Sequence, residues 1–550
     1  MTSRPQSTSG PTLSTGGGLS IQGAAQLPGV APVIQELHQA KVPTKLSAQD
    51  PTLWGPEAEA EARIRLGWLT LPTSSRELLP QLRELRAALI AEGLTRVVLA
   101  GMGGSSLAPE VICRTLGVEL TVLDTTDPAQ IRGALTELDR TIVVVSSKSG
   151  GTVETDSHRR AFLQAFIDSG LTEAQAGQRF VIVTDPGSPL AATAERMGAR
   201  AIFLADPNVG GRYSALSAFG LVPSALAGVE VEHLLDEASQ LASTLNKGGP
   251  SLELGAALGV MAAAGRDKVL LADDGSGIVG FGDWAEQLIA ESTGKQGTGI
   301  LPVVLEASSW EHSIKDADDQ LLISVGGARS VGDVPPLQAD INVNGSLGAQ
   351  FLAWEYATAI AGKLLEIDPF DQPNVTESKE NTAHILETGL PNTEPLFTDG
   401  AIQVYGDAEQ FGNLKTLGGV LDTLIDTIPD RGYLAVLAYL DRHGDADAAA
   451  LRPSLAARTA RPVTFGWGPR FLHSTGQYHK GGPQNGVYLQ ITGTTKEDLE
   501  VPGKPYSFGE LQAAQAAGDL KALQARNRPT VRLHLIDRPA GLAQLVEAQQ

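Results

Sequence analysis

Five short apolar runs, separated by helical segments, constrain the fold of this chain more than any other feature. Each run is rich in valine, isoleucine and leucine and is too short for an independent helix, which favours buried parallel strands. Strands that alternate with crossover helices predict an α/β fold, a parallel sheet covered by helices on both faces. The runs are Arg96–Ala100, Leu120–Leu123, Thr141–Val145, Phe180–Val183 and Ala201–Leu204.

Glycine-rich polar segments follow three of these runs. They are GMGGSS at 101–106, SSKSGGT at 146–152 and NVGGRYS at 208–214. In open parallel sheets, ligands bind beyond the carboxyl ends of the strands. We therefore expect the three segments to meet at one crevice.

The segment SSKSGGT has the composition of an anion site. Ser147, Ser149 and Thr152 supply hydroxyl groups, and Lys148 supplies a compact positive charge. The two glycines could expose backbone N–H groups at the start of a helix, as in phosphate sites. A Ser/Thr helix cap beside a glycine turn is the alternative interpretation. From this segment alone the two interpretations are nearly equal.

The chain has 550 residues, which is more than one hydrophobic core usually covers, so we expect two large domains. A KGGP turn at 247–250 precedes a second α/β pattern and marks the expected boundary. We predict a disordered tail at 1–25, followed by helical wrapping and a first sandwich domain at 26–246. The second sandwich domain would occupy 247–550, with a helical insertion at about 380–460.

Charge and cysteine content exclude several classes of protein. Lys and Arg number 42 against 63 Asp and Glu, for a net charge of −21, so nucleic acid and anionic membranes are not expected partners. No apolar run is long enough to predict a transmembrane helix. The single cysteine, Cys113, cannot form an intrachain disulfide and suits the reducing cytoplasm. An anionic substrate must be held by locally placed cations.

Two further motifs could supply an oxyanion partner and a base. Arg212 follows two glycines, where its guanidinium could turn into the crevice and stabilise an oxyanion, although a surface salt bridge is the alternative. Gln287 and Glu291 are four residues apart on one helical face. Glu291 could act as a general base, although a solvated glutamate at a helix end is the commoner case.

Two later segments add a lysine and histidines. FDQPNVTESK contains Gln372 and Lys379, seven residues apart. FLHSTGQYHKGG contains His473 and, six residues on, His479, and either histidine could serve as an acid or a base. A histidine pair also raises the question of a metal, but nearby carboxylates are lacking, so we expect no metal site.

Taken together, these motifs resemble the phosphoglucose isomerase family from about Arg96 to Lys379. GGRYSALSAFG is similar to the family's first signature, with Pro207 where a polar residue is usual. FDQPNVTESK lacks the Trp-Gly-Val-Glu of the second signature. The chain therefore resembles a divergent bacterial branch, that of the isomerase half of transaldolase–isomerase fusion proteins.

The resemblance implies two α/β/α sandwich domains of the sugar-isomerase (SIS) type, with mainly parallel sheets and helical extensions. It implies reversible isomerisation of glucose 6-phosphate to fructose 6-phosphate through a cis-enediol, in the cytoplasm and as a homodimer. No redox cofactor or metal is required. A dual glucose and mannose 6-phosphate isomerase and a non-catalytic sugar-phosphate sensor are alternatives. Glu291, Arg212 and Lys379 together favour the enzyme over the sensor.

The resemblance also implies roles for individual residues. Glu291 would move a proton between C2 and C1, Arg212 would stabilise the enediolate, and Lys379 would act with a histidine in ring opening. The family's histidine lies in a His-three-residues-Gln motif before the lysine. His473 has this motif but follows Lys379, whereas His312 has the expected order without the motif. A neighbouring subunit could also supply the histidine. The implied substrate-binding residues are Gly104, Ser105, Ser147, Lys148, Ser149, Thr152, Gln287 and Gln372.

Overall fold

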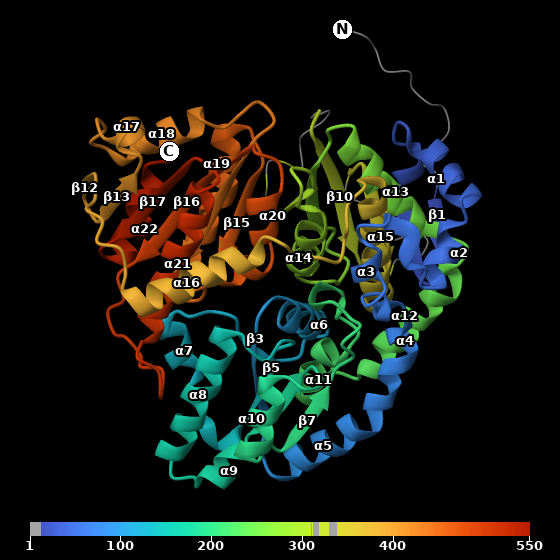
Figure 1. The fold of residues 1–550 in the computed structure, drawn as a ribbon, viewed down its shortest axis with the longest axis horizontal. Coiled ribbons are helices and arrows are strands. Elements are labelled where there is room, and N and C mark those ends of the chain that lie inside the picture. Colours follow the sequence, from blue (N-terminus) through green and yellow to red (C-terminus); the bar gives the residue numbers. More distant parts are fainter. Residues whose placement is uncertain (1–12, 308, 310, 312–317, 329–337, 550) are drawn as a thin grey trace.

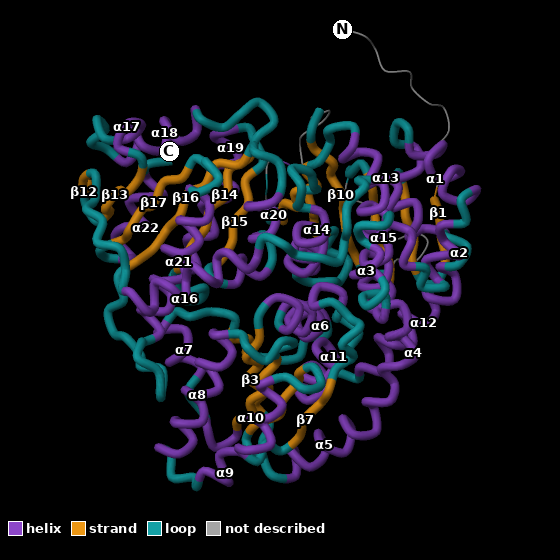
Figure 2. The backbone as a smooth tube through the Cα atoms, viewed as in Figure 1, coloured by secondary structure: helices purple, strands orange, loops and turns teal. Residues whose placement is uncertain are grey.

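A computed structural model describes residues 13–307, 309, 311, 318–328 and 338–549. Within them the protein is an α/β structure with three separate sheets, as the groups of strands in Figure 2 show. In Figure 1 the first sheet forms the lower lobe, the second the upper right lobe and the third the upper left lobe. No described helix is both long enough and apolar enough to cross a membrane.

The first sheet is entirely parallel, in the order β4-β3-β5-β6-β7, and its strands are the five predicted apolar runs. Alternate residues of each strand face two different hydrophobic clusters, so helices cover both faces as predicted. The strands are β3 (Arg96–Gly101), β4 (Thr121–Leu123), β5 (Thr141–Ser146), β6 (Phe180–Thr184) and β7 (Ala201–Leu204). The helices are α6 (Leu107–Thr115), α7 (Pro128–Ala134), α8 (Val153–Asp168), α9 (Glu173–Gly177), α10 (Pro189–Met197) and α11 (Ala218–Ala227).

The second sheet has the order β1-β2-β11-β10-β8-β9, and the helices before the first sheet pack beside it and along α11 and α12. Its strands are β1 (Leu13–Gly16), β2 (Leu19–Gln22), β8 (Lys268–Asp273), β9 (Leu301–Val304), β10 (Gln320–Gly326) and β11 (Ile341–Gly345). The early helices are α1 (Val30–Gln39), α2 (Val42–Ser47), α3 (Glu59–Ala62), α4 (Leu71–Ser74) and α5 (Leu79–Ala91). The later helices are α12 (Val231–Leu245), α13 (Gly249–Ala263), α14 (Phe281–Thr293) and α15 (Leu347–Leu364).

The hairpin of β1 and β2 corrects the expected disordered tail at 1–25. Residues 13–22 pair with each other, and β2 pairs antiparallel with the edge strand β11, where Ile21 lies opposite Val343. The Ser, Thr and Gly content suggested disorder, but a strand far along the chain supplies the hydrogen bonds. Residues 1–12 lie outside the described residues.

The third sheet, in the order β12-β13-β17-β16-β14-β15, builds a lobe of its own at the C-terminal end. Its strands are β12 (Phe397–Asp399), β13 (Ile402–Gly406), β14 (Tyr433–Tyr439), β15 (Val463–Trp467), β16 (Gly486–Gly493) and β17 (Thr530–Leu535). The helices of this region are α16 (Val375–Thr388), α17 (Ala408–Phe411), α18 (Leu417–Asp426), α19 (Leu451–Thr459), α20 (Gly476–Gly481), α21 (Phe508–Gln524) and α22 (Arg538–Glu547).

This third sheet contradicts the expected helical insertion at about 380–460. That region contributes β12, β13 and the interior strand β14 to a sheet separate from the second one. The sequence of β14, YLAVLAY, is buried at every position. A fully buried strand does not alternate polar and apolar residues, so periodicity cannot separate it from a buried helix.

Candidate functional site

A cavity of about 250 Å³ lies between the first and third lobes, and four of the predicted site residues line it. Ser149 and Thr152 come from the loop after β5, Lys379 from α16, and His473 from the turn between β15 and α20. Residues far apart in the sequence therefore converge beside the loop after β5. Of the three glycine-rich segments expected to meet at one crevice, only SSKSGGT lines this cavity.

The loop after β5 forms one wall of this cavity. Gly150 has a φ of +69°, and a Cβ there would lie 2.8 Å from the backbone nitrogen of Leu190, so glycine fits this tight turn. Thr152 is the N-cap of α8, and its hydroxyl lies 2.9 Å from that of Ser147. Gly151 and Thr152 line the cavity, so the positive end of the α8 dipole faces it.

Lys148 is engaged elsewhere. Its ammonium donates a hydrogen bond to Asp185 at 2.6 Å, and it is not among the residues that line the cavity. Burial raises the pKa of Asp185, and the neighbouring Lys148 opposes this shift. In this arrangement Lys148 fixes the loop against the end of β6, and its predicted role as a direct anion ligand stays a prediction.

His473 forms a hydrogen bond with a residue that the sequence did not reveal. Its Nε2 lies 3.1 Å from Oε1 of Glu154, a buried carboxylate in the first turn of α8. The same oxygen accepts a hydrogen bond from Nε2 of Gln515, on α21, at 2.7 Å. Glu154 lies two positions after Thr152, and the acidic first turn of α8 was the signal that could have identified it.

The charge state of Glu154 fixes which nitrogen of His473 is protonated. Burial would raise the pKa of Glu154, but the charges of His473 and Lys379, together with hydrogen bonds, lower it to about 2. An ionised carboxylate can only accept hydrogen bonds, so Nε2 of His473 must carry a hydrogen. The other ring nitrogen, Nδ1, is then free to exchange a proton with a bound molecule.

Gln477, from the His-three-residues-Gln motif, positions the helix that carries Lys379. Its side-chain oxygen accepts from the backbone N–H of Asn374, and its amide nitrogen donates to the Asn374 side chain at 2.8 Å. The same nitrogen donates to the backbone oxygen of Gly294, just after α14. One side chain thus connects the end of α14 to the start of α16.

A second cluster surrounds Arg212, which is almost fully buried. Nη1 of Arg212 lies 3.3 Å from Oε1 of Glu291 and donates to the side-chain oxygen of Gln372 at 3.0 Å. Nε2 of Gln287 donates to Oε2 of Glu291 at 3.0 Å. Arg212 also donates through Nε to Ser292 at 2.8 Å. The structure therefore brings together the four predicted residues of this cluster.

Lys295 holds the loop that carries Gln372 in place. Its ammonium donates to the backbone oxygens of Asp368 and Asp371, both at 2.7 Å. Nη2 of Arg212 donates to the same Asp371 oxygen at 2.9 Å. Burial and the nearby guanidinium of Arg212 lower the pKa of Lys295 to about 8, although Asp371 opposes the shift. Lys295 is not among the site residues predicted from the sequence.

The glycine turn after β3 lies between the two clusters. A Cβ on Gly103 would lie 2.8 Å from both Nε2 of Gln287 and the backbone oxygen of His473. A Cβ on Gly104 would lie 1.9 Å from the backbone oxygen of Gly211. The absence of side chains at this turn lets the Glu291 cluster approach His473. Gly104 and Ser105 do not themselves line the cavity.

His479, the other histidine of the FLHSTGQYHKGG segment, does not line this cavity. His479 is buried among aromatic rings, and neither ring nitrogen has a hydrogen-bond partner among the described residues. Burial lowers the pKa of His479 well below its ordinary value, so it is neutral. His312 lies outside the described residues.

Comparison with known proteins identifies relatives with one described activity. A family model described as "Phosphoglucose isomerase" matches residues 86–261. A protein named "Probable glucose-6-phosphate isomerase" in Natronomonas pharaonis is 31% identical over 304 residues, which cover 51% of this chain and 70% of that protein. The "Glucose-6-phosphate isomerase" of Rubrobacter xylanophilus is 29% identical over 386 residues, covering 58% of this chain and 88% of the relative.

Two solved structures share the fold over about two thirds of the chain. A protein of Thermus thermophilus described as hypothetical superposes with a TM-score of 0.55 at 25% identity, covering 68% of this chain and 100% of that one. A glucose-6-phosphate isomerase from Chlamydia trachomatis gives a TM-score of 0.54 at 20% identity, covering 69% of this chain and 90% of that one. The second likeness concerns the fold alone.

Proposed function

The chain belongs to the phosphoglucose isomerase family, and we propose that it interconverts glucose 6-phosphate and fructose 6-phosphate. One observation carries this proposal. The His473–Glu154 pair and Lys379 share a cavity with the loop after β5, and the cluster of Glu291 and Arg212 adjoins them at Gly103. This arrangement contains an anion site, a group for ring opening and a separate base.

The substrate phosphate binds at the N-terminus of α8. Backbone N–H groups at that end, the hydroxyls of Ser149 and Thr152, and the helix dipole all favour a dianion. Because the chain carries a net charge of −21, this local positive potential has to overcome the overall field.

Ring opening uses His473 and Lys379. Opening a cyclic hexose requires a proton to leave the anomeric hydroxyl and a proton to reach the ring oxygen. Nδ1 of His473 is available for one of these transfers because Glu154 occupies Nε2. Lys379 lies on the facing wall of the same cavity and donates hydrogen bonds or a proton to the other oxygen.

Isomerisation then needs one base on one face of the open chain. Glu291 removes the proton from C2 and returns it to C1, while the hydroxyl proton moves from O2 to O1 through a cis-enediol. The Arg212 guanidinium stabilises the enediolate charge, and the Gln287 amide orients the second oxygen of Glu291. The reaction is redox-neutral, so acid–base groups account for every step.

The test of this proposal is the variant Glu291→Gln, assayed in both directions with a coupled enzyme. We expect kcat to fall by about 10²- to 10⁴-fold, the usual contribution of a general base, with substrate binding retained. Glu380→Gln is the matched control because Glu380 is exposed on α16 outside the cavity. Near-normal turnover of Glu291→Gln would remove Glu291 from the mechanism.

Substrate range, oligomeric state and location complete the proposal. We propose a homodimer, as the family resemblance implies. We also propose a cytoplasmic location, because Cys113 is a free, buried thiol that suits a reducing compartment. Mannose 6-phosphate, assayed beside glucose 6-phosphate, decides whether the enzyme acts on both sugars. A sensor without catalytic activity would bind these sugars without turnover.

Within one chain, His473 hydrogen-bonds Glu154 and lines the same cavity as Lys379, so the proposed ring-opening step needs no residue from a second subunit.

A further inference from the structure

The third sheet leaves one end of one face without a covering helix. Along β13 and β17, residues alternate between the two faces of the sheet. One set is fully buried in the hydrophobic core of this lobe: Ile402, Val404, Val531, Leu533 and Leu535. The opposite set consists almost entirely of polar residues that line a cavity: Gln403, Tyr405, Thr530, Arg532 and His534.

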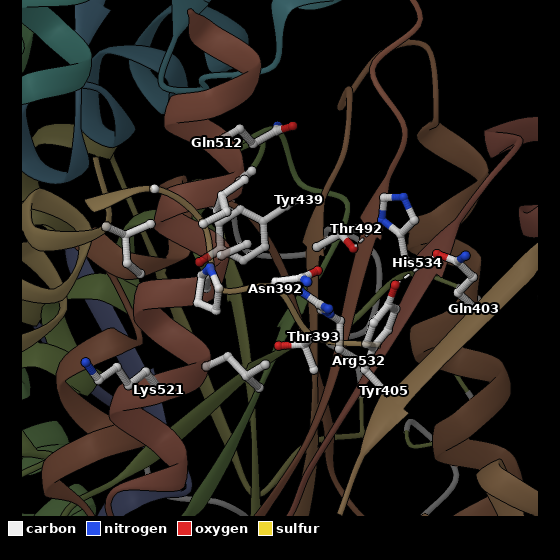
Figure 3. Close-up of a pocket in the computed structure, with 18 of the residues that line it drawn as sticks. Asn392, Thr393, Gln403, Tyr405, Tyr439, Thr492, Gln512, Lys521, Arg532 and His534 are labelled. Carbon is white, nitrogen blue, oxygen red and sulfur yellow. Dashed lines mark hydrogen bonds between the residues drawn. The ribbon is translucent and has the colours of Figure 1, made fainter. Parts of the chain in front are cut away.

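This second cavity has a volume of about 810 Å³. The sheet forms its floor, α21 and the end of α16 form one wall, and the segment 389–393 forms another. Figure 3 shows Arg532 and Tyr405 side by side on the sheet, with Asn392 and Thr393 close to the guanidinium. The cavity shares no lining residue with the catalytic cavity.

Most of the described arginines form a hydrogen bond or an ion pair, but Arg532 does not. Among the described residues its side chain makes no hydrogen bond or ion pair, and its Nε is buried without an acceptor. The guanidinium carbon lies only 3.9 Å from the centroid of the Tyr405 ring, which holds it in place from one side. A fixed, unpaired guanidinium is suited to bind a planar or tetrahedral oxyanion.

The surroundings of Arg532 favour negative charge in a ligand. None of the described residues that line the cavity is an aspartate or a glutamate, although the chain has 63 of these residues. His534 lies beside Arg532 and shares hydrogen bonds with Thr492 at 2.9 Å and Thr494 at 3.2 Å. Burial and the charges of Arg532 and Arg538 lower the pKa of His534. A ligand anion would relieve this positive potential.

The remaining lining residues carry amide and hydroxyl groups suited to a polyhydroxylated ligand. The Tyr405 hydroxyl donates to Gln403 at 2.9 Å, and Gln512 on α21 faces the same space. Thr492 and Asn392 add further donors and acceptors. We propose that this cavity is a second ligand site, which binds a small phosphorylated metabolite with its phosphate on Arg532 and its hydroxyl-bearing body against these side chains.

The proposal is tested by calorimetric titration of the full chain carrying Glu291→Gln, so that no turnover occurs. The probes are inorganic phosphate, glucose 6-phosphate and adenosine monophosphate, titrated separately. We expect at least one probe to bind at a site that Arg532→Gln weakens by about tenfold or more, as expected for loss of a charged hydrogen-bond partner. Arg532→Lys, which keeps the charge, should bind with intermediate affinity.

Two controls separate this site from the catalytic one. Arg461→Gln makes the same substitution in the same lobe, at an arginine that pairs with Asp430, and should leave binding unchanged. The double variant Ser149→Ala, Thr152→Ala should weaken sugar phosphate binding at the catalytic cavity and leave the Arg532-dependent site intact. If Arg532→Gln unfolds like the native chain and binds all three probes as the native chain does, the proposal is wrong.

Discussion

At the scale of single residues, one buried carboxylate determines which ring nitrogen of His473 carries the hydrogen. Glu154 is ionised because its folded pKa of about 2 lies well below the ordinary value of 4.5. It therefore keeps the hydrogen on Nε2 and leaves Nδ1 for the substrate. The Gln515 amide fixes the same oxygen, so the imidazole has one preferred orientation.

We predict that Glu154→Gln lowers kcat by about 10- to 100-fold on cyclic substrate, a loss of about 1.4–2.7 kcal/mol. The open-chain form should be affected less, because its conversion does not need His473. Asp156→Asn is the control, since Asp156 lies on the same helix and pairs with Arg159 and Arg160 outside the cavity. An equal loss of kcat on the cyclic and open-chain forms would contradict the proposal that Glu154 acts by positioning His473.

The contribution of Glu154 to the stability of the fold should decrease at acidic pH. A carboxyl group whose pKa is lower in the folded than in the unfolded chain stabilises the fold at pH values above its unfolded pKa, which is near 4.5. That contribution is lost as the pH falls toward about 2. The difference in unfolding free energy between the native chain and Glu154→Gln should thus be constant from about pH 5 upward and shrink below pH 4.5.

At the scale of elements, local sequence predicted the first sheet well. The run TIVVV became β5 and led into the polar loop because β-branched residues bounded by glycine leave few alternatives. The helix predicted for Gln287 and Glu291 was also confirmed. The strands β1 and β2 were missed because they are only four residues long and lie in a Ser-, Thr- and Gly-rich segment. The strand β14 was missed because complete burial leaves no period-two pattern to detect.

The hairpin gives a prediction about a single glycine. Gly17 has a φ of +60°, and a Cβ there would lie 2.5 Å from Cα of Leu241, a backbone atom that cannot move aside cheaply. A left-handed conformation alone costs about 1–2 kcal/mol. We expect Gly17→Ala to destabilise the chain by more than this amount, and urea unfolding measures the difference.

Gly117→Ala is the control for the clash. Gly117 has a nearly identical φ of +66°, but no atom lies within 4 Å of the position of its Cβ. The control should show only the conformational cost. Equal losses in the two variants would mean that the hairpin yields to the added methyl group.

At the scale of the whole molecule, the site exists only because three lobes are docked together. Glu154 and His473 are 319 residues apart and belong to different lobes, and Lys379 comes from the helix between the second and third sheets. Motifs indicated which residue types to expect, but they could not show that Glu154 meets His473. Such pairings depend on the relative placement of the lobes, which no local pattern encodes.

We therefore expect the contact between the first and third lobes to affect the proposed activity from outside the cavity. Phe508, at the start of α21, is fully buried and packs with Ile131 and Ala161 of the first lobe. The same helix carries Gln515 to Glu154. We predict that Phe508→Ala lowers both stability, by about 3–5 kcal/mol, and kcat/KM, because α21 and the His473 turn lose their fixed position against α8.

Phe411→Ala separates the two effects. Phe411 is also fully buried, but it packs within the core of the third lobe and touches neither the first lobe core nor the cavity lining. It should lower the urea midpoint by a similar amount while kcat/KM, measured well below that midpoint, stays near the native value. If both variants keep native kcat/KM, docking at Phe508 does not position the site. If both lose it, general destabilisation rather than lobe docking explains the loss.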